Sequence, residues 1–287
     1  MSWELGIEHV TRVTYPGPVL ASFNEARMTP ATLPGQETLK AEVAVGPGAA
    51  SVRTYRDRWS TRVTAFDLTS SHDELTIRAT ATVRTSPARL PGKGGADGWD
   101  TVRGTVRRAA TGSRLMECCL PTRLTALDPR ARKSALSGVG KMPPSVAAET
   151  IADRVRERVA FMPGATGVGT GAQEAWEKGQ GVCQDLAHAT VALLRAAGLP
   201  ARYVSGYLHP DANAEPGQAA FGQSHAWAEY WAGDWFPLDP TAGVPVAERH
   251  VVVARGRDYA DVPPLKGYYQ GPPPDSTNVT VRVTRLA

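Results

Sequence analysis

The sequence contains a thiol, an imidazole and a carboxylate in the order that an activated cysteine nucleophile requires. Cys183 lies in the segment GQGVCQDLAH, His225 follows 42 residues later in SHAW, and Asp239 follows 14 residues after that in LDPT. In such a set the thiol attacks a carbonyl carbon, the imidazole takes the thiol proton, and the carboxylate orients the imidazole ring. We therefore predict that Cys183, His225 and Asp239 are catalytic residues.

The residues around Cys183 predict that it lies in the first turn of a helix. Apolar residues recur at three- and four-residue intervals from Cys183 to Ala197, and Gly198 and Pro200 follow where a helix would end. The unpaired N–H groups and the positive dipole end of a helix stabilise a thiolate, and they can also hold the oxyanion of a tetrahedral intermediate. We interpret Asp185 as a structural residue of this first turn, because its charge would oppose thiolate formation.

The spacing of His225 and Asp239 makes a prediction about the turn between their strands. Residues 225–231 and 235–238 are predicted strands of one hairpin. If 232–234 form a three-residue turn, Asp239 is a diagonal neighbour of His225 on the same face. A two-residue turn would put Asp239 on the opposite face, because one step of register inverts every side chain. A working triad therefore predicts the three-residue turn.

Side-chain types alternate with a period of two residues along much of the first 85 residues, and clusters of glycine and proline separate the alternating segments. Such patterns are typical of an antiparallel sheet or sandwich. The predicted strands are 3–14, 38–45, 52–68 and 74–85.

The second half of the sequence predicts helices before Cys183 and strands after it. A helix is expected from Ser145 to Phe161, with Ser145 as its N-cap and Glu149 at the capping-box distance. A shorter helix is expected within 128–138. Further strands are expected at 201–208, 249–254 and 277–284. Pro237 removes a backbone donor, which favours an edge position for its strand.

One central helix on an antiparallel sheet is an α+β arrangement. We expect an N-terminal antiparallel β region at 1–90, a connecting region at 91–144 with a Gly-rich loop at Pro91–Asp100, and a catalytic core at 145–287.

Composition and charge exclude several classes of protein. The chain has 287 residues, 42% of them hydrophobic, a net charge of +4 and three cysteines. No dense basic patch predicts nucleic-acid binding, and no apolar run predicts a membrane span. With no secretory signal and an odd number of cysteines, we expect a cytoplasmic protein with reduced thiols. The oligomeric state stays open.

A metal site is the main alternative use of cysteine and histidine, and the spacing does not favour it. The candidate ligands lack the paired short-range spacing of zinc sites; they are Cys118, Cys119, Cys183, His188 and His225. Phosphate-binding and dinucleotide-binding motifs are absent as well. We therefore expect no metal and no cofactor. Trp227 is expected either to support or shield the site or to be an ordinary core aromatic.

Five linked segments resemble the bacterial transglutaminase-like proteins. They are GQGVCQDLAH, GLPARYVSGYL at 198–208, SHAWAEY, LDPT, and GRDYADVPP at 256–264, and residues 15–27 are similar to that family's N-terminal β region. The resemblance covers most of the chain and is weakest at about 90–140. It implies a papain-like core with Cys183 as nucleophile, His225 as base and Asp239 as the orienting carboxylate.

The resemblance does not decide the reaction. The superfamily includes cross-linking transglutaminases, peptidases and other amidases, and some members have no known catalysis. We expect acyl transfer from amide bonds of peptides or proteins through a thioester. Hydrolysis is favoured, because no site for a second, amine substrate can be inferred and water is the default acceptor. Protein-glutamine cross-linking and a non-catalytic protein-binding module remain alternatives.

Overall fold

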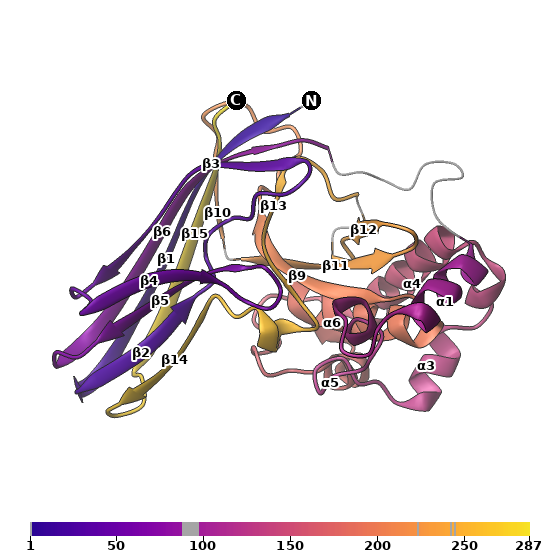
Figure 1. Ribbon diagram of the computed structural model, residues 1–287, viewed down its shortest axis with the longest axis horizontal. Helices are drawn as coiled ribbons and strands as arrows, with labels where there is room; N and C mark the ends of the chain where they lie inside the picture. Colours follow the sequence, from indigo (N-terminus) through magenta and orange to yellow (C-terminus); the bar gives the residue numbers. More distant parts are fainter. Residues whose placement is uncertain (1, 88–97, 223, 242, 244) are drawn as a thin grey trace.

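The computed structural model describes residues 2–87, 98–222, 224–241, 243 and 245–287. A β-sandwich occupies one side of the molecule and a helix-rich part with a further sheet occupies the other (Figure 1). The predicted α+β fold, with an antiparallel β region and a helix-on-sheet core, is confirmed.

Two antiparallel sheets form the sandwich. The first has the order β10 (Ala219–Gly222), β15 (Ser276–Arg285), β1 (Trp3–Val19), β6 (His72–Thr85) and β3 (Gln36–Gly46). The second has the order β14 (Leu265–Gln270), β2 (Ala21–Ala26), β5 (Arg62–Leu68) and β4 (Ser51–Arg56). Buried side chains from both sheets meet between them, among them Val13, Phe66 and Leu75. The sandwich thus takes strands from both ends of the chain, and the limits at 90 and 144 stay a prediction.

The third sheet carries the residues predicted to be catalytic. Its order is β12 (Trp235–Leu238), β11 (His225–Trp231), β9 (Ala201–Leu208) and β13 (His250–Gly256). Helix α6 (Cys183–Ala197) packs against β9 and β11, with Leu186 and Leu193 in one buried cluster with Ala228 and Tyr230. This is the predicted central helix on an antiparallel sheet. The strand that contains Pro237 is an edge strand, as predicted.

The remaining helices lie in the same part of the molecule as α6 (Figure 1). They are α1 (Trp99–Arg108), α2 (Arg114–Glu117), α3 (Pro129–Ala135), α4 (Pro144–Arg158) and α5 (Ala172–Lys178), with the 3₁₀ turns η1 (Val139–Lys141) and η2 (Tyr259–Asp261). Of these helices, α3, α4 and α5 contact α6. The short strands β7 (Ala160–Phe161) and β8 (Gln180–Gly181) pair in parallel. Across the described part of the chain, the helices are all too short or too polar to span a membrane.

Several predicted element limits were wrong. Helix α4 has Pro143 as its N-cap and Pro144 at its first position, so Ser145 lies inside the helix. Proline suits that first position because its φ is already helical and its missing N–H would have no partner. The predicted strand 52–68 is a hairpin of β4 and β5, and β1 continues through 15–18 with an irregular register.

Three strands of the sandwich were not predicted, β2, β10 and β14, because ASFNEA, AAFG and LKGYYQ show no clear alternation of apolar and polar residues. The two-residue strands β7 and β8 were not predicted either. Most of the predicted loop Pro91–Asp100 lies outside the described residues.

The sandwich and the third sheet share a hydrophobic core. Trp3, Leu5 and Ile7 of β1 are buried with Tyr203 of β9 and Val251 of β13. Cys183 packs against the same cluster. The sandwich therefore contributes to the surroundings of the thiol as well as to its own core.

Gly206 occupies a position in β9 where no side chain fits. It pairs with His225, and a Cβ atom there would lie 2.0 Å from the Val251 carbonyl oxygen and 2.7 Å from the Trp227 ring. Gly206→Ala is therefore expected to lower the free energy of unfolding by about 1–3 kcal/mol, because backbone and indole must both move. Urea denaturation, monitored by tryptophan fluorescence, measures this change in the free energy of unfolding.

Gly222→Ala is the matched control, because Gly222 also lies in a strand and has no atom within 4 Å of the added Cβ. An equal loss of stability in both variants would show that crowding at Gly206 is not the cause.

Candidate active site

The chain before α6 places Cys183 at the first helical position. Helix α5 ends at Gly179, which has the left-handed φ of +70° that favours glycine. Gly181 then lies against Asp185, where an added Cβ would be 2.8 Å from the Asp185 Cβ. Both glycines are thus needed for the close turn that leads into Cys183, which is half-buried.

Asp185 stabilises this turn, as the sequence predicted. Its Oδ2 accepts hydrogen bonds from the backbone N–H of Val182, at 2.8 Å, and from the hydroxyl of Thr166. Burial raises the pKa of Asp185, against the effect of these hydrogen bonds. The carboxylate therefore caps the helix start and points back toward the chain before it.

The hairpin of β11 and β12 has the predicted three-residue turn. Trp231 pairs with Trp235, so that 232–234 form the turn. The Nε2 atom of His225 lies 2.7 Å from Oδ2 of Asp239, whose side chain is fully buried. The diagonal relation expected from the sequence is therefore present in the structure.

The second nitrogen of His225 faces the thiol. Nε2 is occupied by Asp239, which leaves Nδ1 as the ring nitrogen available to Cys183, and Cys183 is near enough to act on the pKa of His225. Burial of His225 would lower its pKa, but hydrogen bonds to Asp239 and Cys183 and the charges of both outweigh this effect and raise the pKa to about 9. The structure thus brings the three predicted residues together and favours a protonated His225 at neutral pH.

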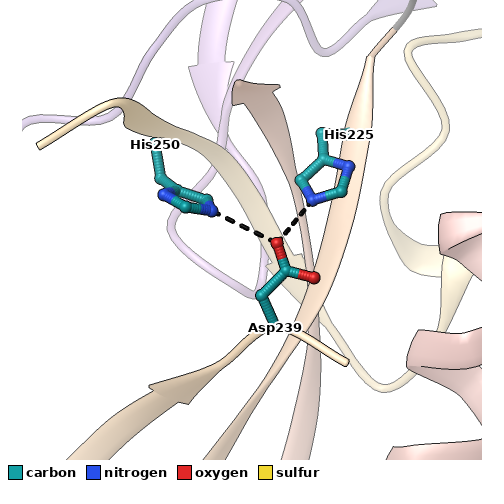
Figure 2. Close-up of side chains that lie close together, drawn as sticks. All are labelled: His225, Asp239 and His250. Atoms are coloured by element: carbon teal, nitrogen blue, oxygen red, sulfur yellow. Dashed lines mark hydrogen bonds and ion pairs between the residues drawn. The ribbon is translucent and has the colours of Figure 1, made fainter. Parts of the chain in front are cut away.

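A second imidazole contacts the same carboxylate. Nε2 of His250, at the start of β13, lies 3.2 Å from Oδ2 of Asp239, so two histidines meet one oxygen (Figure 2). Sequence reasoning missed His250, because it is a single histidine at the start of a predicted strand and has no spacing typical of a catalytic motif. The hydrogen bonds of Asp239 hold its pKa well below the usual range despite burial, which acts in the opposite direction.

The nitrogen and oxygen atoms of His225, Asp239 and His250 lie within 4.8 Å of one another, close enough to be considered as metal ligands. The backbone N–H of Ala247 donates to Nδ1 of His250 at 3.2 Å, so the ring proton is on Nε2, the atom that faces the carboxylate. Metal-bound histidines instead donate their second N–H to an acceptor. The hydrogen bonding of His250 therefore favours a donor to Asp239 over a metal ligand.

Trp227 packs between the two histidines. Its ring is fully buried, stacks on His225 with a centroid distance of 5.9 Å, and presents an edge contact to His250 at 5.4 Å. The structure therefore places Trp227 where it can support and shield both imidazoles, the first of the two roles expected from the sequence.

The other cysteines and His188 have separate surroundings. His188 is buried, accepts a hydrogen bond from the backbone N–H of Tyr259, and packs against Tyr203. Cys118 and Cys119 are free thiols. Burial raises the pKa of Cys118 to about 11 and also raises that of Cys119. Both are therefore expected to stay protonated at neutral pH.

Comparisons with known proteins agree with the resemblance seen in the sequence. The model of the transglutaminase-like superfamily matches residues 133–240, and the model of the bacterial transglutaminase-like N-terminal region matches residues 5–84. An uncharacterized protein of Mycobacterium leprae is 38% identical over 290 residues, covering 99% of this chain and 100% of its own.

More distant relatives differ in their descriptions. A Pseudomonas aeruginosa protein named protein-glutamine gamma-glutamyltransferase is 34% identical over 122 residues, covering 40% of this chain and 18% of its own length. A solved structure described as "a Putative Cysteine Protease from Cytophaga hutchinsonii" is similar in fold, with a TM-score of 0.75 and 22% identity over 100% of this chain and 92% of the other.

The His225–Asp239 contact predicts a specific titration. We expect the imidazole of His225 to lose its proton near pH 9 in the native protein. In Asp239→Asn the pKa of His225 should fall well below this value, because the stabilising charge is lost while burial remains. The ring resonances in NMR spectra recorded against pH measure both pKa values.

His9 is an internal control, because burial lowers its pKa to about 4 and it bonds to Tyr207 rather than to Asp239. Its pKa should be the same in both proteins. An unchanged pKa for His225 in Asp239→Asn would contradict the assigned role of the carboxylate.

Proposed function

Because this chain belongs to the transglutaminase-like superfamily, with its bacterial N-terminal region, we propose that it is a cysteine-dependent enzyme acting on amide bonds of peptides or proteins. Cys183 is the proposed nucleophile, His225 the acid and base, and Asp239 the orienting carboxylate. The observation that carries the proposal is the position of His225: its Nε2 lies 2.7 Å from Asp239, and the Cys183 thiol lies close enough to the ring to contribute to its raised pKa.

The first half of the proposed reaction forms a thioester. The Cys183 thiolate attacks the amide carbonyl carbon, and the carbonyl electron pair moves to oxygen. When this oxyanion collapses, the C–N bond breaks, and the imidazolium of His225 gives its proton to the leaving amine. The products are a free amine, a neutral imidazole and an acyl group on sulfur.

The second half transfers the acyl group to an acceptor. The neutral His225 takes a proton from water, whose oxygen attacks the thioester, and the thiolate leaves while His225 is again protonated. An amine would follow the same path and would give a new amide. We favour water, because it is the default acceptor and because no set of the described residues identifies a pocket for an amine. Transfer of the acyl group to an amine is the second candidate reaction, because one relative is named a protein-glutamine gamma-glutamyltransferase.

The start of α6 can stabilise the oxyanion in both halves. Cys183 stands at the first helical position, where a backbone N–H has no acceptor within the helix. An oxyanion on the carbon bound to Sγ would lie next to this N–H and at the positive end of the helix dipole. The Gln184 side chain makes a contact of 3.4 Å with the Gly167 carbonyl, so its amide is directed away from this role.

A non-catalytic protein-binding module is the competing function on the same fold. It would need neither a reactive thiol nor a protonated imidazole. The geometry of Cys183, His225 and Asp239 supports the enzyme, because each residue has the partner that its catalytic role requires.

Thiol labelling separates these functions. At pH 7 iodoacetamide is expected to modify Cys183 first, because it lies at a helix start beside a protonated imidazole, whereas Cys118 and Cys119 have raised pKa values. His225→Ala should slow this reaction at least about tenfold. Mass spectrometry of the intact and digested protein measures the rate and the site. Equal rates with and without His225 would favour the binding module.

Substrate turnover tests the reaction itself. We expect the protein to hydrolyse members of a peptide pool, and Cys183→Ala to lose at least about three orders of magnitude in rate. The assay is repeated with a primary amine in excess, and the products are identified by mass spectrometry. Acids as the main products support water as acceptor, whereas amine adducts as the main products would support cross-linking instead. Turnover by Cys183→Ala at the native rate would reject cysteine catalysis.

A further inference from the structure

We propose that His250 is a positioning residue for Asp239, and that the N-terminal β region holds His250 in place through Gln36. The proposal rests on the proposed function, because it assumes that Asp239 orients a catalytic imidazole. It gives the N-terminal region a part in building the active site, in addition to any contact it makes with substrate.

The carboxylate of Asp239 is held on three sides. His225 and His250 both reach Oδ2, at 2.7 and 3.2 Å (Figure 2). The backbone N–H of Thr241 donates to Oδ1 at 2.8 Å. The side chains of His250 and Asp239 are 1% and 0% exposed, so water does not compete for these contacts. Without His250, one side of Oδ2 would have no donor.

The two histidines differ in their second partners. Nδ1 of His250 accepts the Ala247 N–H, so the ring is a neutral donor through Nε2. Burial lowers the pKa of His250 although Asp239 raises it, which also favours the neutral ring. His225 has the Cys183 thiol as its second partner and takes the positive charge. His250 can therefore orient the carboxylate without competing for the proton that catalysis needs.

Apart from His225, no described ionisable side chain forms a hydrogen bond with Asp239 or His250 other than the bond between these two residues. The groups acting on His250 are Asp239, His225 and Arg249, and Arg249 directs its guanidinium to the carbonyls of His209 and Pro210. The titration of His225 is therefore governed by its contacts with Asp239 and Cys183, together with burial.

Gln36 joins the N-terminal region to the strand of His250. Val252, two residues after His250, donates its N–H to Oε1 of Gln36 and accepts from Nε2 of Gln36, both at 2.8 Å. The buried amide of Gln36 thus acts like a peptide group of a further strand along the edge of β13. The Ala31 N–H donates to the same Val252 carbonyl at 2.9 Å.

A second contact holds the turn before His250. The hydroxyl of Thr85, at the end of β6, donates to the carbonyl of Glu248. The N–H of His250 donates to the Ala247 carbonyl at 3.0 Å, which closes the turn. The N-terminal region therefore contacts the chain on both sides of His250, at Glu248 and at Val252.

Two substitutions at His250 isolate its bond to Asp239. Gln can donate from a position near Nε2, whereas Leu cannot, and both are expected to lose the acceptor for Ala247. If His250 positions Asp239, His250→Leu lets the carboxylate move, the pKa of His225 falls, and alkylation of Cys183 at pH 7 slows about tenfold or more. His250→Gln should keep both properties close to native. Ring NMR spectra and mass spectrometry measure them.

The opposite result has a clear signature. If His250 only shares Oδ2 with His225, its removal leaves Asp239 in place as a stronger acceptor, and the pKa of His225 stays the same or rises. That result, or equal effects of Leu and Gln, would overturn the proposal.

Gln36→Leu tests the contribution of the N-terminal region at a distance from the site. It removes both hydrogen bonds to Val252, and we expect the same direction of change as in His250→Leu with a smaller size, roughly three- to tenfold in the alkylation rate. His72→Leu is the control, because His72 is a buried histidine of the sandwich whose hydrogen bond goes to the Ser70 carbonyl. A native alkylation rate and His225 pKa in Gln36→Leu would overturn the role of the N-terminal region.

The readouts also separate this proposal from the proposed function. The pKa of His225 and the alkylation of Cys183 can be measured in a protein that turns over no amide. If peptides are not cleaved while the His250 variants behave as expected, the positioning holds and the reaction is wrong. If peptides are cleaved while the variants have native pKa values and rates, the positioning is wrong and the reaction holds. Circular dichroism of each variant shows whether it is folded.

Discussion

The buried carboxylate of Asp239 is the contact on which the rest of the site depends. A buried anion is stable only when its oxygens are hydrogen-bonded and its charge is paired. Here His225 supplies the charge and a donor, His250 a neutral donor, and the Thr241 N–H the contact to the second oxygen. The same arrangement raises the pKa of His225, so that the proton which the proposed reaction gives to the leaving amine is held at neutral pH.

The third sheet makes this contact possible by bringing three strands to one place. The three-residue turn after Trp231 puts Asp239 on the face of His225, and β13 brings His250 to the same carboxylate oxygen. Gly206 leaves room for Trp227, which packs on both rings. Below them, Glu229 is buried between Arg202 and Arg255, and the two guanidinium groups overcome burial to lower its pKa to about 2. Ion pairs of Glu229 with Arg202 and Arg255 therefore connect the strands near the centre of the sheet, and hydrogen bonds to Asp239 connect them at the site.

The sandwich is joined to the part that carries the candidate active site too closely to be regarded as a separate accessory. Residues of β1 share a buried cluster with Cys183 and Tyr203, and Gln36 completes the edge of β13. The final strand β15 pairs with β1, so the chain returns to the sandwich after it has built the site. A change in the sandwich can therefore reach the imidazoles through the packing of β13, without any contact with substrate.

The periodicity of apolar residues was enough to predict the helix of Cys183 and its end at Gly198. The three-residue turn and the pairing of His225 with Asp239 followed from strand register together with the assumption that the three residues form a triad. The sequence also predicted an α+β fold with an antiparallel β region. The predicted start of α4 was wrong because prolines, and not the expected Ser145, begin that helix, with Pro144 at its first position. Strands such as β10 and β14 were missed because their residues do not alternate between apolar and polar. His250 and Gln36 were out of reach for another reason. His250 lies only 11 residues from Asp239, but no hairpin register relates the two residues, and Gln36 lies 216 residues from Val252. Only the packing of β13 against the sandwich brings these side chains to their partners.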